Sequence, residues 1–412
     1  MTPFAYSGDS LFAEQVPLAD IAQKCGTPCY VYSAGAIRAR LHAYSQALNG
    51  LPHTVCYAVK ANSNLAVLSL LAREGAGFDI VSGGELFRVL KAGGDTSKVI
   101  FSGVGKTRAE VDYALSSGIR SFNCESEPEL ALIDSLAARI GSKPSVALRV
   151  NPDVNAETHP YISTGLRDHK FGIDIAEAES IYHRARDLRN LVVDGVSCHI
   201  GSQLLDTEPI LEAVDRVLEL VGRLRQAGIA IRHLDLGGGL GIAYHSKQQA
   251  PVIEAFIAAV RKKLAGQDLT ILVEPGRSIA GEAGVMLTRV LYRKRTQQKE
   301  FVVVDAAMND LIRPSLYKSH HEIIPLRRSP LPPVIADIVG PVCESGDFLA
   351  KDREIANVLP GDLLAVCTAG AYGFVQASNY NSRPRPPEVM VDGHEWRIVR
   401  ARETFEDLIR GE

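Results

Sequence analysis

The chain of 412 residues is longer than one ordinary compact domain, and it has room for a barrel of about 250 residues with a smaller partner domain. A hydrophobic fraction of 46%, a charged fraction of 23% and a formal net charge of -3 are those of an average globular protein with ample material for a core. This balance argues against nucleic acid and anionic membranes as partners. With no long apolar run and no signal pattern in the opening residues, we expect a cytoplasmic protein.

Cysteine is scattered through the chain, at Cys25, Cys29, Cys56, Cys124, Cys198, Cys343 and Cys367. The count is odd, and no pair has the Cys-x-x-Cys spacing of a redox or zinc motif. We therefore expect neither a disulfide framework nor a metal site. Most of these thiols should be small buried hydrophobes.

Short β-rich runs recur along the first two thirds of the chain. They are Val55 to Val59, Phe78 to Val81, Val99 to Ser102, Ser121 to Asn123, Val146 to Val150, Gly195 to Ile200, His233 to Leu236 and Thr270 to Val273. Segments with helical spacing separate them, the clearest from Glu208 to Gln226. The runs are continuously apolar, as strands covered on both faces are, and several helices should end at Gly75, Gly93, Gly118 and Gly228. This alternation predicts an α/β fold with a (β/α)8 TIM-type barrel, although an open doubly wound sheet would look similar locally.

After about Gly281 the pattern changes to strands without long helices between them. The predicted strands are Val285 to Tyr292, Glu300 to Asp305, Val334 to Val339, Asp362 to Thr368, Glu388 to Val391 and His394 to Arg400. Asp392 and Gly393 form a hairpin signal between the last two. We predict a barrel over residues 30–281 and a second, mainly antiparallel β domain made of residues 1–29 and 282–412.

Lys60 follows the first barrel strand in the run YAVKAN, directly after four residues that should be buried. Active sites of such barrels lie at the carboxyl ends of the strands, and a partly desolvated amine there suits a Schiff-base nucleophile. An ordinary strand-end lysine that reaches water would give the same pattern. Position alone does not separate the two interpretations.

Two glycine-containing loops follow the seventh and eighth strands. Residues 235–241 read DLGGGLG and residues 274–277 read EPGR. Barrels commonly hold phosphate on these two loops, because glycine lets backbone N–H groups approach the ligand closely. Either loop alone is a weak signal, but both together with Lys60 indicate a phosphorylated cofactor.

Several polar side chains should project from the same strand ends. Glu274 could hold a proton on a pyridine nitrogen, or form an ion pair with a neighbouring arginine. His199 could stack on a ring or be a satisfied core histidine. Asp79 and Arg149 could surround Lys60 or form a structural ion pair, because buried charge is costly unless it is paired.

The second domain contributes further candidates. Arg313 and Tyr317, within RPSLY, together with Arg277 suggest recognition of a carboxylate that the reaction retains, since arginine binds carboxylates in bidentate fashion. Cys343 and Glu344, within CESGD, offer a proton donor and an ammonium ligand. Tyr372, within GAYG, has glycines on both sides that could let it approach a ligand. Each motif alone could be an ordinary surface segment.

These motifs, in this order, resemble the fold-type III decarboxylases of the alanine racemase and ornithine decarboxylase group, and most closely the bacterial diaminopimelate decarboxylases. The segments that carry the resemblance span essentially the whole chain: YAVKAN, FDIVSGGE, FSGVGKT, HPYISTGLRDHKFG, HIGSQ, DLGGGLG, EPGR, DAAMNDLIRPSLY, CESGDFLAKDR and AGAYGF.

The resemblance implies pyridoxal 5'-phosphate as the cofactor, held covalently by Lys60. It implies that Glu274 contacts the pyridine nitrogen and that His199 stacks on the ring. The remaining implied cofactor contacts are Asp79, Ser202, Gly237, Gly238, Gly239, Pro275, Gly276, Arg277 and Tyr372. The implied substrate contacts are Arg277, Arg313, Tyr317, Glu344 and Tyr372, with Cys343 as proton donor. The resemblance further implies a homodimer with shared active sites, and no metal.

The implied reaction converts meso-2,6-diaminopimelate to L-lysine and carbon dioxide, the last step of lysine biosynthesis by the diaminopimelate pathway. A decarboxylase of ornithine, lysine or arginine is the enzymatic alternative, but RPSLY and CESGD argue against it. A relative that binds the cofactor without catalysis would be expected to lose Lys60 or Cys343, and this chain keeps both.

Overall fold

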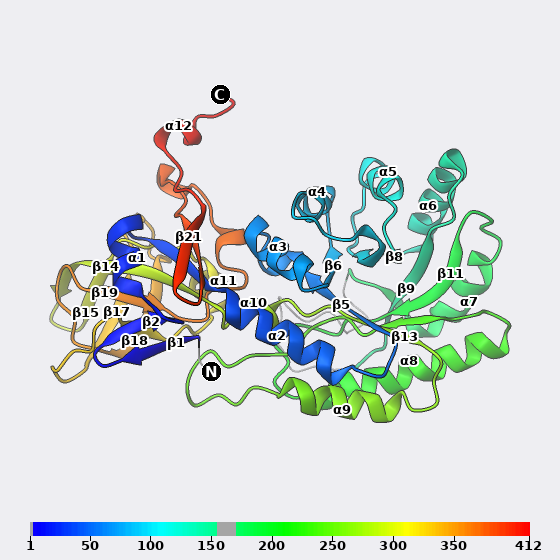
Figure 1. Cartoon of the computed structure of the whole chain (residues 1–412), viewed down its shortest axis with the longest axis horizontal. Helices are drawn as coiled ribbons and strands as arrows, with labels where there is room; N and C mark the ends of the chain where they lie inside the picture. Colours follow the sequence, from blue (N-terminus) through cyan, green and yellow to red (C-terminus); the bar gives the residue numbers. More distant parts are fainter. Residues whose placement is uncertain (1–2, 155–169) are drawn as a thin grey trace. The chain divides into compact units, whose positions relative to one another are not determined.

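The structure, a computed structural model, describes residues 3–154 and 170–412 (Figure 1). The chain folds into two compact units. The barrel unit contains Arg40–Ile242 and Ala250–Ser278, and the second unit contains Met1–Ala39, Ala243–Gln249 and Ile279–Glu412. Most of the motif HPYISTGLRDHKFG, residues 159–169, lies outside the described residues. Among the helices of the described ranges, none combines the length and the apolar character needed to cross a bilayer.

The barrel unit is a closed ring of parallel strands, as the sequence predicts. In ring order its strands are β5 (His53–Ala58), β6 (Gly77–Ile80), β7 (Val99–Phe101), β8 (Ser121–Cys124), β9 (Ser145–Asn151), β11 (Val192–Ser197), β12 (His233–Asp235) and β13 (Thr270–Val273). The ring closes because β13 pairs with β5. An open sheet is therefore excluded. The short β10 (Ile173–Asp174) extends β9 on one side.

Helices lie outside this ring (Figure 1). They are α3 (Leu65–Arg73), α4 (Gly83–Lys91), α5 (Arg108–Ser117), α6 (Glu127–Ile140), α7 (Ile175–Ala185), α8 (Glu208–Gln226) and α9 (Ile253–Lys263), with α2 (Ala34–Ala47) before β5. The eighth strand is followed only by the single turn α10 (Arg277–Ala280). The expected glycines Gly75, Gly93, Gly118 and Gly228 all follow helices with positive φ, a conformation that glycine adopts without steric cost.

The apolar pattern of α8 explains why this helix packs on the barrel. Its buried stripe includes Ile210, Leu211, Val214, Val217, Leu220, Val221 and Leu224. Burial of each such side chain stabilises the fold by about 1.5–3 kcal/mol. Leu218 is only half-buried, and Leu220 is a member of the buried stripe in its place.

The second unit is a mainly antiparallel β structure, also as predicted. Its main sheet has the strand order β18 (Phe348–Ile355), β17 (Val334–Val339), β15 (Glu300–Val304), β14 (Gly284–Arg295), β4 (Cys29–Ser33), β20 (Glu388–Asp392) and β21 (Glu395–Arg400). In addition, β19 (Leu363–Val366) pairs with β14 and with β16 (Ile323–Pro325). A separate small sheet contains β1 (Phe4–Ser7), β2 (Ser10–Ala13) and β3 (Val16–Pro17), and the helices are α1 (Leu18–Cys25), α11 (Arg313–Tyr317) and α12 (Phe405–Leu408).

The division between the units differs from the predicted barrel bounds, 30–281, at residues 30–39, 243–249 and 279–281. The strand β4 lies between β14 and β20 in the second sheet, although the sequence placed Tyr30 to Ser33 in the barrel range. All five residues of β4 are buried, and Val31 joins the core formed by Val285, Leu287 and Val389. Residues 243–249 also belong to the second unit, although they lie within the barrel's stretch of sequence.

Candidate active site at the carboxyl ends of the barrel strands

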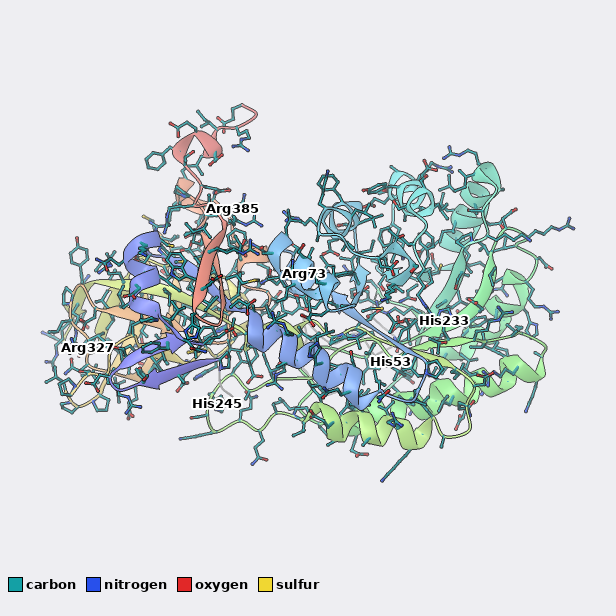
Figure 2. All side chains as sticks on the ribbon, in the orientation of Figure 1. His53, Arg73, His233, His245, Arg327 and Arg385 are labelled. Carbon is teal, nitrogen blue, oxygen red and sulfur yellow. The ribbon has the colours of Figure 1, made fainter. Side chains whose placement is uncertain are left out.

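Lys60 lies in the short 3-10 turn Val59–Ala61 that follows β5. Its amine is 2.5 Å from Asp79 Oδ2, whose carboxyl group is fully buried on β6. His53 and His233, marked in Figure 2, begin β5 and β12, so they lie at the amino ends of these strands and Lys60 lies at the opposite end. The amine therefore stands at the end of the barrel where enzymes of this fold carry their sites.

The two glycine loops pack directly beside the lysine segment. A Cβ atom added to Gly276 would lie 2.9 Å from Ala61 Cβ, and the amide of Ala58 donates to the carbonyl of Pro275 at 3.2 Å. A Cβ at Gly238 would lie 2.3 Å from the carbonyl oxygen of Glu274. Only glycine fits such close backbone contacts, so the loops after β12 and β13 and the Lys60 turn form one continuous rim.

Two backbone N–H groups of this rim, those of Gly239 and Gly276, can bind an anion, whereas those of Gly237 and Gly238 already have acceptors. Gly237 donates its N–H to Asp235 Oδ1, and Gly238 donates to His199 Nδ1. Across residues 3–154 and 170–412, no protein acceptor bonds the N–H groups of Gly239 and Gly276. Backbone amides in this state are a common component of phosphate sites.

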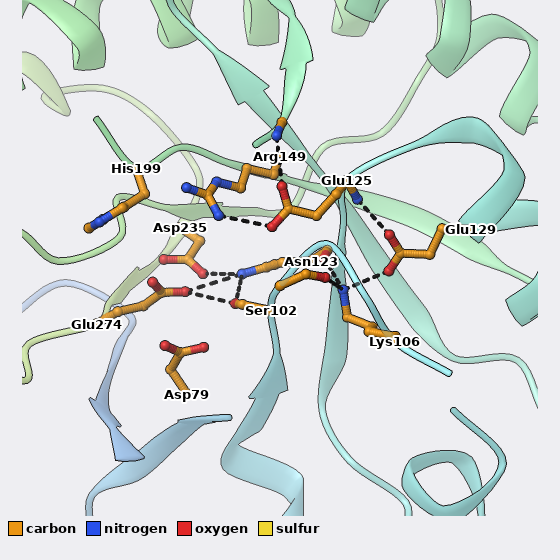
Figure 3. A network of polar contacts seen from close by, with 12 residues as sticks. Asp79, Ser102, Lys106, Asn123, Glu125, Glu129, Arg149, His199, Asp235 and Glu274 are labelled. Atoms are coloured by element: carbon orange, nitrogen blue, oxygen red, sulfur yellow. Dashed lines mark hydrogen bonds and ion pairs between the residues drawn. The ribbon is translucent and has the colours of Figure 1, made fainter. Parts of the chain in front are cut away.

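Glu274 and Asp235 form a buried network with Asn123 and Ser102 (Figure 3). The Asn123 amide donates to Asp235 Oδ2 at 2.8 Å and to Glu274 Oε1 at 3.2 Å. Ser102 Oγ donates to the same Glu274 oxygen at 3.3 Å. Burial raises the pKa of Glu274 well above its usual range, and the nearby charges of Asp235 and Asp79 raise it further. The pKa of Asp235 is also raised, mainly by burial. The pair therefore holds a proton more readily than two ordinary carboxyl groups do.

His199 follows β11 and is fixed by the glycine loop. Because Nδ1 accepts the N–H of Gly238 at 3.2 Å, the proton of the neutral ring lies on Nε2. Burial lowers the pKa of His199 well below its usual range, and the positive charges of Arg149 and Lys60 lower it further. The imidazole is therefore a neutral, oriented ring.

The remaining barrel candidates separate into two pairs. Arg277 Nη2 donates to Ser202 Oγ at 2.9 Å, which joins the loops after β13 and β11. Arg149 does not bond Lys60: its guanidinium donates to Glu125 at 2.9 Å and lies 4.9 Å from the centre of the Phe171 ring. Of the two residues expected around Lys60, Asp79 contacts it and Arg149 forms the structural ion pair.

The second unit holds the other predicted site residues. Arg313 begins α11, is buried, and packs 4.7 Å from the ring centre of Tyr244. Tyr317 ends the same helix, and its hydroxyl accepts a hydrogen bond from Gln376 Nε2 at 3.3 Å. The arginine and the tyrosine therefore lie about one turn apart on one short helix.

Cys343, Glu344 and Tyr372 lie in loops of the second unit. The Cys343 thiol is exposed, and its backbone N–H donates to Asn381 Oδ1 at 3.2 Å. A hydrogen bond with Glu344 raises the pKa of the exposed Tyr380 hydroxyl. Tyr372 has a φ of +56°, and an aromatic residue in the left-handed region is strained and is often found at functional sites.

The glycines beside Tyr372 serve packing within the protein. A Cβ at Gly370 would lie 2.0 Å from the carbonyl oxygen of Ala280, and one at Gly373 would lie 2.9 Å from the Tyr30 ring. The sequence interpretation was that these glycines could let Tyr372 approach a ligand closely. In the structure both glycines pack tightly against neighbouring backbone or the Tyr30 ring.

The sequence interpretation missed three polar residues of the barrel site: Ser102, Asn123 and Asp235. Each lies at or just after the carboxyl end of a predicted strand, so polar residues at strand ends were the signal that could have found them. Tyr244 and His321, which contact Arg313, had no such signal. Tyr244 comes from a segment far from RPSLY in the sequence, whereas His321 lies only four residues after the motif.

Comparison with known proteins agrees with this geometry. Residues 34–281 match the family model described as pyridoxal-dependent decarboxylase, pyridoxal binding domain. The chain is 58% identical over 412 residues to diaminopimelate decarboxylase of Pseudomonas aeruginosa, covering 100% of this chain and 99% of that one. It is 53% identical to the enzyme of Vibrio cholerae over 99% of this chain and 98% of that one.

Solved structures give the same result. Diaminopimelate decarboxylase from Helicobacter pylori complexed with L-lysine matches with a TM-score of 0.92 and 43% identity, covering 95% of this chain and 98% of that one. The enzyme from M. jannaschii matches with a TM-score of 0.95 and 38% identity, covering 100% and 97%. Together with the family match across the barrel, these similarities show that the chain belongs to the pyridoxal-dependent decarboxylase family.

Proposed function

We propose that the protein is a diaminopimelate decarboxylase, which converts meso-2,6-diaminopimelate to L-lysine and carbon dioxide with pyridoxal 5'-phosphate as cofactor. The observation that carries this function is the rim itself, where the Lys60 turn, both glycine loops and the buried Glu274 meet at one end of the barrel. Full-length relatives at 44–58% identity bear the name of this activity.

The residues of the rim fit the cofactor. The N–H groups of Gly239 and Gly276, with Arg277 and Ser202 beside them, would bind the phosphate. Lys60 would hold the cofactor covalently through its amine, and Asp79, Pro275, Gly237 and Gly238 would line the same site. Tyr372 is proposed as a further cofactor contact from the second unit, supported by its strained backbone.

The bound cofactor supplies an electron sink for the bond pair left on the α carbon when carbon dioxide departs. Glu274 would keep a proton on the ring nitrogen, because burial and the neighbouring carboxyl groups favour a proton in this pair. His199 is neutral and fixed by Gly238, so it can lie against the ring without adding a charge.

We assign substrate recognition to Arg277, Arg313, Tyr317, Glu344 and Tyr372. The two guanidiniums would bind the carboxylate that the reaction retains, in the geometry that arginine favours. Glu344 would bind the distal ammonium group. Cys343 would return a proton to the α carbon, for which an exposed thiol is accessible.

We further propose that the enzyme is a cytoplasmic homodimer in which Cys343 and Glu344 serve the neighbouring subunit's cofactor. The exposure of the Cys343 thiol on the single chain is compatible with such an exchange. All seven cysteines are free, which fits a reducing compartment.

The test is release of carbon dioxide from meso-diaminopimelate, compared with ornithine, lysine and arginine. We expect turnover of diaminopimelate alone, abolished in Lys60→Ala and strongly reduced in Arg313→Ala. Borohydride should fix the cofactor to Lys60 in the wild type only. Preferred turnover of ornithine, lysine or arginine would assign the protein to the basic amino-acid decarboxylases. Unchanged turnover of diaminopimelate in Arg313→Ala would remove Arg313 from the carboxylate site.

A further inference from the structure

The guanidinium of Arg313 is held by a set of neighbours that the sequence did not predict. Its plane lies over the Tyr244 ring at 4.7 Å, its Nη1 bonds His321 Nε2 at 3.1 Å, and its Nη2 donates to Ser319 Oγ at 3.3 Å. The Tyr244 and His321 rings also meet edge to face, with centroids 5.3 Å apart. Arg313 is 5% exposed and His321 is 0% exposed. The arginine is therefore fixed in both plane and direction.

The contacts of His321 determine its protonation state. Arginine has only donors, so the Nε2 atom that it contacts must be an acceptor without a proton. The other ring nitrogen, Nδ1, lies 2.8 Å from the carbonyl oxygen of Cys367, which can only accept. One neutral tautomer satisfies both partners. Its ring therefore joins the backbone at Cys367 to the guanidinium of Arg313.

An arginine that binds a substrate carboxylate gains affinity when its planar group is held in the binding orientation beforehand. His321 holds the guanidinium in this way, and because its ring is neutral it adds no negative charge that would compete with the substrate carboxylate for Arg313. We propose that His321 is a positioning residue, which acts through Arg313 to set affinity for substrates that retain a carboxylate. This inference rests on the proposed function, since it needs Arg313 to bind that carboxylate.

The adjacent histidine provides a matched control. His320 Nε2 contacts Glu322 at 2.9 Å and Arg353 at 3.0 Å, and its ring meets that of His245, marked in Figure 2. Within the part of the chain that the structure describes, none of these contacts joins it to Arg313. A substitution at His320 therefore tests the general sensitivity of this segment.

Two substitutions at His321 separate positioning from packing. Asparagine places its amide N–H near the position of Nδ1, so His321→Asn keeps the bond to Cys367 and loses the acceptor for Arg313. Glutamine reaches the position of Nε2, so His321→Gln keeps an acceptor for Arg313. Steady-state kinetics with meso-diaminopimelate, with thermal midpoints as a check on folding, should be measured for wild type, both variants and His320→Asn.

We expect His321→Asn to raise KM by about 10-fold to 100-fold, the effect of losing one hydrogen bond to a charged group, with kcat nearly unchanged. KM for His321→Gln and His320→Asn should stay within about threefold of the wild-type value. In an Arg313→Ala background, the Asn and Gln variants should have the same KM, because there is no guanidinium left to position.

Equal KM values for His321→Asn and His321→Gln in the native background would overturn the inference. So would a difference between them that persists without Arg313. If the wild type released no carbon dioxide from diaminopimelate, the proposed function would fail, and the inference would fall with it. That result is distinguishable because it appears before any variant is made.

Discussion

The buried amide of Asn123 offers a test of the network beneath the proposed cofactor ring. Asn123 is 1% exposed and donates to two carboxyl groups, Asp235 at 2.8 Å and Glu274 at 3.2 Å. Leucine has the same branching and number of side-chain heavy atoms, with bulkier methyl groups, so Asn123→Leu removes the donors and leaves no cavity. The variant leaves both carboxyl groups buried without this donor.

The expected loss depends on pH. Both carboxyl groups have folded-state pKa values raised above their unfolded values, so they favour folding below about pH 4, and this contribution is lost as the pH rises through the folded values. The Asn123 bond lowers the pKa of Asp235, so its removal raises that pKa further and makes the loss steeper. We expect the free energy of unfolding to fall by about 3–5 kcal/mol near pH 8, from two bonds to a partly ionised pair, and by about 1–2 kcal/mol near pH 5.

Urea denaturation followed by circular dichroism at these two pH values measures the difference. Asn190→Leu is the control, because the half-buried Asn190 also donates to a carboxylate, Asp134, at 3.2 Å on the same unit. Its loss should stay below about 1 kcal/mol and should not change with pH. An equal loss at both pH values for Asn123→Leu, or a loss no larger than the control, would refute the reasoning.

Three further predictions follow from individual contacts. Gly237→Ala should lower the thermal midpoint and weaken binding of pyridoxal phosphate, because φ at Gly237 is +64° and the new Cβ would lie 2.5 Å from the carbonyl oxygen of Cys198. Unchanged binding in a fluorescence titration would contradict this prediction. Ser202→Ala should weaken cofactor binding by about threefold to tenfold through loss of its bond to Arg277, with thermal stability nearly unchanged, and equilibrium dialysis measures this directly. Burial raises the pKa of Asp310 to about 7, so ionisation of this group lowers the stability of the fold as the pH rises from about 4 to 7. The thermal midpoint of Asp310→Asn should therefore rise relative to that of the wild type between about pH 5 and pH 8. A difference that stays constant or shrinks over this range would contradict the prediction.

The sequence by itself determined the alternation of eight apolar strands with helices and the position of Lys60 after the first strand, while ring closure was decided by the structure. Strands covered on both faces must be apolar throughout, so the eight runs could be recognised locally, and the helix ends were marked by glycines that need positive φ. Lys60 and the two glycine loops could be assigned to one end of the barrel, because parallel strands all end on the same side. The predicted order and direction of the strands were enough to assign Lys60 and both loops to that end.

Side-chain partners required the tertiary structure. Asn123, Asp235 and Glu274 are more than a hundred residues apart at the extremes, and only ring closure places β8, β12 and β13 so that one amide bonds two carboxyl groups. The edge strand β18 was not predicted from the sequence, because the exposed Lys351 and Asp352 interrupt its apolar pattern.

The second unit shows the same limit more clearly. Tyr244 lies within the barrel's stretch of sequence but belongs to the unit that carries Arg313, and β4 lies between strands from the far end of the chain. Local periodicity reports whether a residue is buried, because burial is a property of each element's face. It carries no information about which distant residue shares that burial, and the hydrogen bonds to Glu274 and the packing of Arg313 on Tyr244 depend on that pairing.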